Sequence, residues 1–213
     1  RAIIVGRRTF GKGLVQAVIS LQDKSRINLT IAKYHLPSGR CIQKPYFKDQ
    51  LHKYRMENNQ RLEGEDFDIF HDSLRFYTKT GRIVYAESGI SPDELIPLNN
   101  DYRTKLSLQL TEKKLISDFV VKFYSPQMLI GNSPKECVEN IKTEKLIKLL
   151  RNYSELKDIS WNKEQWEISK PYLLNKIKAH IAKMKYGKNG YFKISSLMDQ
   201  DILKAQKISL IKN

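Results

Sequence analysis

The chain has 213 residues, a formal net charge of +15 from 38 Lys and Arg against 23 Asp and Glu, and 40% hydrophobic residues. This length suits one large domain or two small ones, and the composition excludes an intrinsically disordered chain. No apolar run approaches the roughly 20 residues of a membrane-spanning helix. The charge leaves open nucleic acid or an anionic membrane surface as a partner. Because the basic residues form no continuous run and no aromatic cluster accompanies them, a solvated basic surface is the preferred interpretation.

Residues 1–45 read as β structure. An apolar run over 2–5 is typical of a buried strand. Apolar and polar residues then alternate over 15–21 and again over 27–31, on either side of the polar sequence QDKS at 22–25. Two period-2 runs around a short polar turn predict a β-hairpin, and residues 41–43 predict a further short strand. Since a natural chain seldom begins directly on a strand, we expect residue 1 to be an internal position of a longer protein.

Residues 46–80 are polar and weakly periodic, which predicts a loop-rich insertion. Short strands are expected over 81–102, in the stretches 82–85 and 94–97. After about residue 103 the apolar spacing becomes helical. Three stripes carry this prediction: Leu115, Ile116, Phe119, Val120 and Phe123; Leu146, Leu149, Leu150 and Tyr153; Leu173, Ile177, Ile181 and Met184. These stripes suit an intramolecular core, which we prefer, or an assembly element.

The ends of these helices carry their own signals. Ser133 to Glu136 form a capping-box start with proline at the first helical position. Gly187 is expected to end the helix of the third stripe, and one more short helix is expected within 191–210.

Cysteine and histidine usage does not point to a metal. Cys41 and Cys137 lie far apart and lack a CxxC partner, so neither a disulfide scaffold nor a zinc site is expected. The four histidines show no metal-ligand spacing and are His35, His52, His71 and His180. His180 falls on the apolar face of a predicted helix, which predicts a packing role.

The stretch from Gly6 to Gln16 holds one lysine, Lys12, between two glycines just after a strand. Its first seven positions match the phosphate-binding pattern G-x-x-x-x-G-K-[ST]. The eighth position is Gly13, which has no hydroxyl to bind magnesium, and the alternating residues that follow predict a strand rather than the required helix. Two independent requirements fail, so phosphate binding is excluded.

A lysine general base is the second interpretation of Lys12. The amine must be neutral to accept a proton, which requires its pKa to fall from about 10.4 toward 7–8. No acidic residue occurs over 1–22, and Phe10, Leu14 and Val15 can cover the amine. Gln16 can orient it without adding a negative charge. An ordinary loop lysine beside a hairpin fits these residues equally well.

A family resemblance favours the catalytic interpretation. Residues 9–16 (TFGKGLVQ), 27–34 (INLTIAKY), 37–40 (PSGR) and 89–93 (GISPD) resemble segments of the carboxy-terminal processing peptidases, also called tail-specific proteases. Residues 41–46 and the helical tail resemble the bacterial branch with an extended C-terminal region. The chain departs from the family's usual pattern at Lys24 in the hairpin turn, at Leu36 and around Ala86, but not at Lys12 or Gln16.

The resemblance implies a serine endopeptidase that cleaves proteins near their C-termini, with Lys12 as general base and Gln16 as its orienting partner. It places the nucleophilic serine and a PDZ domain before residue 1, so this chain alone is expected to be inactive. Ser20, Ser25 and Ser38 lie in strand or turn positions with a structural interpretation. The resemblance also implies accessible protein C-termini as substrates, no metal or organic cofactor, no nucleic-acid partner, a homo-oligomer as one option, and a cell-envelope or periplasmic location.

The implied fold class is α/β: a β-rich N-terminal part belonging to a ClpP/crotonase-like catalytic core, followed by a mostly α-helical C-terminal region. The expected organisation is a catalytic segment over 1–45, an insertion over 46–80, strands returning to the core over 81–102, and a helical region over 103–213. The alternative function is a non-enzymatic basic module that binds nucleic acid or an envelope surface, and the charge of +15 is the feature that supports it.

Overall fold

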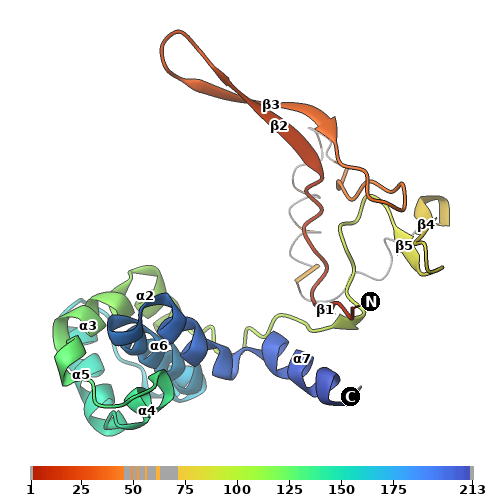
Figure 1. The fold of residues 1–213 in the computed structure, drawn as a ribbon. Coiled ribbons are helices and arrows are strands. Elements are labelled where there is room, and N and C mark those ends of the chain that lie inside the picture. The colour runs from red at the N-terminus through yellow and green to blue at the C-terminus, as the bar shows by residue number, and fades with distance from the viewer. Residues whose placement is uncertain are drawn as a thin grey trace. The chain divides into compact units, whose positions relative to one another are not determined.

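The computed structural model describes residues 2–45, 49, 52, 56, 61, 62 and 72–211. The chain divides into two compact units, Arg1–Leu98 and Asn99–Asn213, whose elements are labelled in Figure 1. Most of the insertion predicted over 46–80 lies outside the described residues. Within the described ranges, no helix has both the length and the apolar character needed to cross a membrane.

The described residues of the first unit form three two-stranded sheets. Their strands are β1 (Val5–Gly6) parallel to β6 (Glu94–Leu95), β2 (Leu14–Ser20) antiparallel to β3 (Arg26–Lys33), and β4 (Arg75–Tyr77) antiparallel to β5 (Ile83–Tyr85), with a 3₁₀ turn, η3 (Asp72–Leu74), before β4. The hairpin of β2 and β3 confirms the predicted one. β4 lies in the segment predicted to be loop-rich, because three residues are too few to show an alternation. No strand forms over 41–43, where the backbone bonds to other segments instead.

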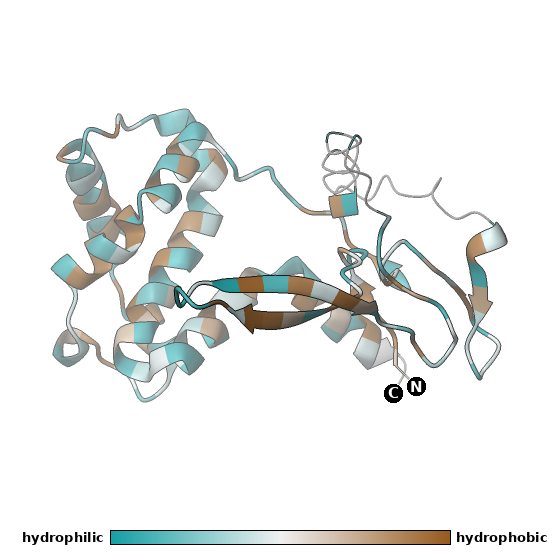
Figure 2. Ribbon diagram, turned by 90° about the horizontal axis from the view of Figure 1, so that it is seen from above, coloured by the Kyte–Doolittle hydropathy of each residue, from teal (hydrophilic) through white to brown (hydrophobic). Residues whose placement is uncertain are grey.

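The β2–β3 hairpin carries an apolar face that is exposed in this chain. Leu29 lies opposite Ala17 and Ile27 lies opposite Ile19, so these side chains share one face of the two-stranded sheet. All eight residues of β3 are exposed, and Figure 2 shows hydrophobic residues along both strands. A two-stranded hairpin is at best marginally stable in water by itself, so this face is suited to burial against another layer.

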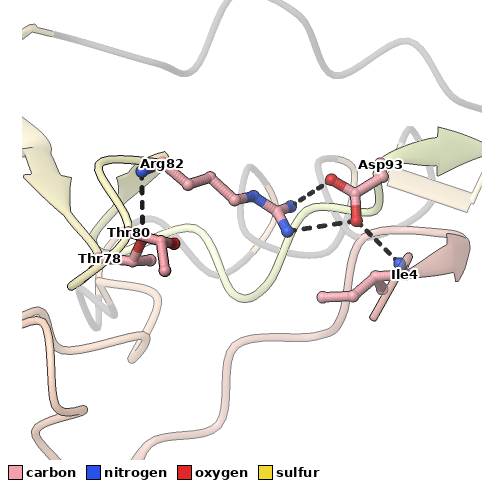
Figure 3. A network of polar contacts seen from close by, with 5 residues as sticks. All are labelled: Ile4, Thr78, Thr80, Arg82 and Asp93. Atoms are coloured by element: carbon pink, nitrogen blue, oxygen red, sulfur yellow. Dashed lines mark hydrogen bonds and ion pairs between the residues drawn. The ribbon is translucent and has the colours of Figure 1, made fainter. Parts of the chain in front are cut away.

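A polar network ties the two ends of the first unit together (Figure 3). Asp93 accepts a hydrogen bond from the backbone N–H of Ile4 at 2.8 Å and pairs with the Arg82 guanidinium at 2.6 Å. The backbone N–H of Arg82 in turn donates to the Thr78 hydroxyl at 3.1 Å. The network therefore joins the chain before β1 to the β4–β5 turn and to the segment that leads into β6.

The described part of the second unit is built from helices. They are α2 (Lys105–Glu112), α3 (Leu115–Phe123), α4 (Pro134–Glu139), α5 (Thr143–Glu155), α6 (Lys163–Ser195) and α7 (Gln200–Ile211), with 3₁₀ turns η4 (Pro126–Met128) and η5 (Ser196–Met198). The long helix α6 packs against α2, α3 and α4 (Figure 1). Residues of all three predicted stripes are buried together in the core of this unit, which confirms the intramolecular interpretation.

The helix ends at Ser133 and Gly187 agree with the signals in the sequence. Ser133 caps α4 by accepting from the backbone N–H of Glu136 at 3.2 Å, as predicted. The predicted helix end at Gly187 is confirmed, and a second helical stretch follows the break and runs to Ser195. The backbone does leave helical geometry at Gly187, with φ 62° and ψ −154°. Ile194, in the stretch beyond the break, is buried.

Candidate active site

Lys12 lies in the loop between β1 and β2, and backbone contacts with the segment before β6 fix one end of this loop. The Thr9 N–H donates to the Ile90 carbonyl at 2.9 Å, and the Ile90 N–H donates back to the Thr9 hydroxyl at 2.8 Å. These reciprocal bonds join two stretches 81 residues apart in the sequence.

The other end of the loop is fixed by residues that follow the hairpin. The Lys44 N–H donates to the Gly11 carbonyl at 2.9 Å. The Gly13 N–H donates to the Gln43 side-chain oxygen at 2.8 Å, and its carbonyl accepts from the Tyr34 N–H at 2.7 Å. The glycines on both sides of Lys12 are therefore held by backbone or amide partners, and the lysine backbone between them is positioned before any substrate binds.

Two of the glycines here are required by close backbone approach. Gly11 has φ +84°, and a Cβ on it would lie 2.9 Å from the Ile42 carbonyl oxygen. Gly89 has φ +76°, and a Cβ on it would lie 2.3 Å from the Thr9 carbonyl oxygen. Only glycine satisfies both the left-handed backbone and the space. The strand β2 that follows Gly13 confirms that the helix of a phosphate loop is absent from this position.

The side chains of the two predicted site residues meet. The Lys12 Nζ donates to the Gln16 Oε1 at 3.1 Å. Gln16 follows a shift in the β2–β3 register between Val15 and Gln16, which is a bulge that re-aims the side chains on either side of it. In the described part of the chain no ion pair and no serine hydrogen bond involves Lys12, so its side-chain partner is an uncharged amide.

The described residues do not provide the expected covering of the amine. Lys12 and Gln16 are exposed, and Phe10 retains 42% of its accessible surface. Leu14 and Val15 are half-buried. The expectation was wrong for this chain because the apolar face of the hairpin packs against no described layer that would exclude water from the lysine.

Buried arginines brace the loop, and sequence reasoning missed them. Arg8 and Arg40 are 4% and 8% exposed. The Arg8 guanidinium donates to the Ser88 carbonyl, and that of Arg40 donates to the Tyr85 carbonyl at 2.8 Å. Burial, with the nearby charge of Arg82, lowers the pKa of the Arg40 guanidinium. Both link the Lys12 region to residues 85–88, and no local pattern in the sequence marks them.

The described residues offer no metal centre. They contain no group of three or more His, Cys, Asp and Glu side chains with a geometry that could hold an ion. The chemistry that the described arrangement supports is proton transfer by an amine whose orientation is set by a neighbouring amide.

Comparison with known proteins finds relatives of the N-terminal segment that holds Lys12 and Gln16. Residues 1–52 match the model of peptidase family S41. A C-terminal processing peptidase, chloroplastic, of Tetradesmus obliquus is 50% identical over 44 residues, which are 21% of this chain and 10% of that protein. Carboxyl-terminal-processing protease of Synechocystis sp. is 48% identical over 44 residues (21% and 10%), and carboxy-terminal-processing protease of Bartonella bacilliformis is 49% identical over 43 residues (20% and 10%).

The helical part of the chain matches a different family model. Residues 106–187 match the model of a family of unknown function, DUF8443. No solved structure matches the chain. The matched stretch spans about a tenth of the length of the three curated relatives described above. The N-terminal segment of this chain, which holds Lys12 and Gln16, is related to the carboxyl-terminal processing proteases of peptidase family S41.

Proposed function

We propose that this chain is the C-terminal part of a serine endopeptidase that cleaves proteins near their C-termini, with Lys12 as general base and Gln16 as its positioning residue. The observation that carries the proposal is the 3.1 Å contact between the Lys12 Nζ and the Gln16 Oε1. This contact sits on a loop clamped by residues 34–44 and 89–90, and the segments resembling the processing peptidases lie among these residues.

In the proposed mechanism, neutral Lys12 accepts the proton of a serine hydroxyl as the serine oxygen attacks a peptide carbonyl. The ammonium of Lys12 then gives this proton to the leaving amine when the carbon–nitrogen bond breaks. A neutral amine has two N–H groups and one lone pair. Because one N–H is donated to Gln16, the lone pair stays available to accept the proton of a hydroxyl.

The nucleophile and the covering layer are proposed to come from residues that precede residue 1 in a longer protein. That layer would pack on the apolar face of the hairpin, complete a ClpP/crotonase-like α/β core and exclude water from Lys12. Exclusion of water favours the neutral amine over the ammonium. We further propose that the substrates are proteins with accessible C-termini and that the enzyme works outside the cytoplasm, at the cell envelope.

A serine-directed fluorophosphonate probe tests whether the nucleophilic serine precedes residue 1. We expect the longer protein to be labelled on one serine located before residue 1, as identified by mass spectrometry of the labelled peptide. The present chain is expected to remain unlabelled under the same conditions. Labelling of a serine within residues 1–213, or hydrolysis of casein by this chain alone, would overturn the assignment of the nucleophile.

A further inference from the structure

The second unit contains a cavity of about 450 Å³ between the end of α3, the segment around η4 and the start of α5. This volume lies in the range of small-ligand and peptide-anchor sites. Most of its walls are apolar, with contributions from Phe123, Leu129, Ile141 and Leu149. The cavity lies within residues 106–187, the stretch whose matching family has no known function.

Hydrogen bonds from three side chains hold the wall formed by residues 129–131. The Lys185 Nζ donates to the carbonyls of Leu129 and Gly131 at 2.9 and 3.0 Å, and the Tyr186 hydroxyl donates to the Gly131 carbonyl at 2.7 Å. The Asn140 side-chain amide donates to the Ile130 carbonyl at 3.1 Å. Three successive carbonyls are thereby satisfied, so the wall is preorganised for a ligand.

The mouth of the cavity combines exposed apolar and cationic side chains. Met128 and Ile130 are 63% and 75% exposed although both line the cavity. Lys142 and Lys145 are exposed on its rim, and no acidic residue lines it. Glu144, in the first turn of α5, is the acid between these lysines in the sequence and does not line the cavity. The site therefore suits an apolar group that carries a negative charge at one end.

Two polar residues of the cavity lining, the buried Cys137 and the exposed Asn140, favour a peptide over a fatty acid. The buried Cys137 lines the interior, and burial raises the pKa of its thiol, so this surface stays uncharged at neutral pH. The Asn140 Oδ1 accepts no hydrogen bond from the residues that the structure describes, whereas its amide nitrogen is used. This oxygen can accept a peptide N–H, a donor that a fatty acyl chain lacks.

We propose that this cavity binds the C-terminal end of a polypeptide, with apolar last residues inside it and the free carboxylate at Lys142 and Lys145. The inference rests on the proposed function, because the polypeptide would be the tail of a substrate. Its binding step nevertheless involves none of the residues of the Lys12 loop.

Fluorescence anisotropy of the present chain with an N-terminally labelled peptide ending in Val-Leu-Leu tests the inference. We expect the free-acid peptide to bind at least about tenfold more tightly than the same peptide with a C-terminal amide, because a charge-assisted contact to lysine is lost. The double variant Lys142→Gln and Lys145→Gln should remove this difference. The matched control, Lys188→Gln with Lys193→Gln, changes two exposed lysines of the same unit outside the cavity and should preserve it.

A second variant addresses the apolar part of the site. Ile130→Glu places a negative charge at the mouth, and since Ile130 is 75% exposed the fold should be retained, as checked by circular dichroism. We expect this change to weaken the binding of the free-acid peptide by more than about tenfold, because apolar contact is lost and the introduced carboxylate repels that of the peptide.

Several outcomes would overturn the inference: equal affinities for the acid and amide peptides, no effect of the lysine pair, or binding of decanoate without binding of the peptide. The last outcome would identify a site for small amphiphiles instead. Lys12→Arg should leave peptide affinity unchanged. Failure of the binding inference therefore leaves the proposed catalytic role of Lys12 untouched, and failure of that role leaves the binding data standing.

Discussion

At the scale of single residues, the pairing of Lys12 with an amide rather than a carboxylate is the feature with the most chemical consequence. The Gln16 Oε1 lies 3.1 Å from the Lys12 Nζ. An amide oxygen fixes the direction of an N–H group, whereas a carboxylate at the same place would also stabilise the ammonium. A base must be neutral to act, so the choice between glutamine and glutamate sets the pH range in which Lys12 could serve.

Replacement of Gln16 by glutamate tests this reasoning. In the longer protein, Gln16→Glu should move the rising limb of the pH–rate profile for kcat/KM to higher pH, because a nearby negative charge favours the ammonium form of Lys12. Gln16→Ala, which removes the contact without adding charge, should lower kcat and leave the position of the limb nearly unchanged. A limb at the same pH in Gln16→Glu and wild type would show that Gln16 does not act through Lys12.

Gly89, in the segment whose hydrogen bonds hold the Lys12 loop, offers a second test at this scale. Gly89 and Gly81 have similar φ angles, +76° and +78°, but a Cβ on Gly81 would meet nothing within 4 Å. Gly81→Ala should therefore cost about 1 kcal/mol, for the left-handed backbone alone. Gly89→Ala should cost more than about 2 kcal/mol, since the Thr9 carbonyl must also move. Hydrogen exchange measures the cost of Gly89→Ala in peptides covering residues 9–13 and that of Gly81→Ala in peptides covering residues 78–82, and equal costs would contradict the close approach of Gly89 to Thr9.

At the scale of elements, the regular patterns of the sequence were sufficient for prediction. The alternation in β2 and β3 and the apolar stripes of α3, α5 and α6 all appear in the structure, because each rests on a repeated spacing. The 3.1 Å contact of Lys12 with Gln16 joins residues that the sequence singles out together. The sequence could not predict the hydrogen bonds that hold the Lys12 loop. The bonds that link Thr9 to Ile90 and Gly13 to Gln43 join distant residues, and no periodic pattern indicates them.

The break in α6 at Gly187 is a second example of what the sequence does and does not predict. Gly187 is a conventional stop signal, and the backbone does leave helical geometry there. The helix nevertheless resumes, with Gly190 and Ile194 buried beyond the break. The stop signal at Gly187 was therefore correct, and what only the structure shows is that a second helical stretch follows it directly.

His180 gives α6 a predicted pH dependence. Its ring is half-buried and contacts the Tyr191 ring edge to face at 5.1 Å, in keeping with the packing role expected for it. Burial, then the charges of Lys183 and Lys176, lower its pKa from the ordinary value of 6.5. Below about pH 6.5 the unfolded chain therefore binds a proton that the folded chain does not, and this contribution to stability is lost as the pH falls.

Urea unfolding at pH 8 and pH 5.5 measures this effect through tryptophan fluorescence. We expect the wild-type midpoint to fall between these values by more than that of His180→Gln, which lacks the titrating group. A larger fall in the variant, or equal falls in both chains, would contradict the assignment. Carboxylates contribute equally to both chains, so the difference between them isolates His180.

At the scale of the whole molecule, the two units differ in how completely each encloses its core. The second unit buries apolar stripes from α3, α5 and α6 around fully buried side chains such as Phe119, Leu150 and Ile177. The first unit leaves the apolar face of its hairpin exposed. This contrast matches the proposal that the first unit is part of a larger catalytic core, whereas the second is self-sufficient.

A truncated chain of residues 99–213 tests that self-sufficiency. Both tryptophans, Trp161 and Trp166, lie in this unit with ring centroids 4.7 Å apart. We therefore expect the truncated chain to retain the tryptophan emission and the urea midpoint of the full chain, with helical circular dichroism. A collapse of the emission toward that of unfolded tryptophan would show that the second unit requires the first.

The central claim is that Lys12 transfers a proton, and the turnover of Lys12→Arg in the longer protein tests it most directly. Arginine keeps the positive charge and length but stays protonated in proteins, so it cannot act as a base. The account predicts that kcat/KM for a peptide substrate falls by at least about 10²–10⁴, with an unchanged circular dichroism spectrum. The matched control, Lys33→Arg on exposed β3, should retain activity. Wild-type turnover by Lys12→Arg would contradict the account.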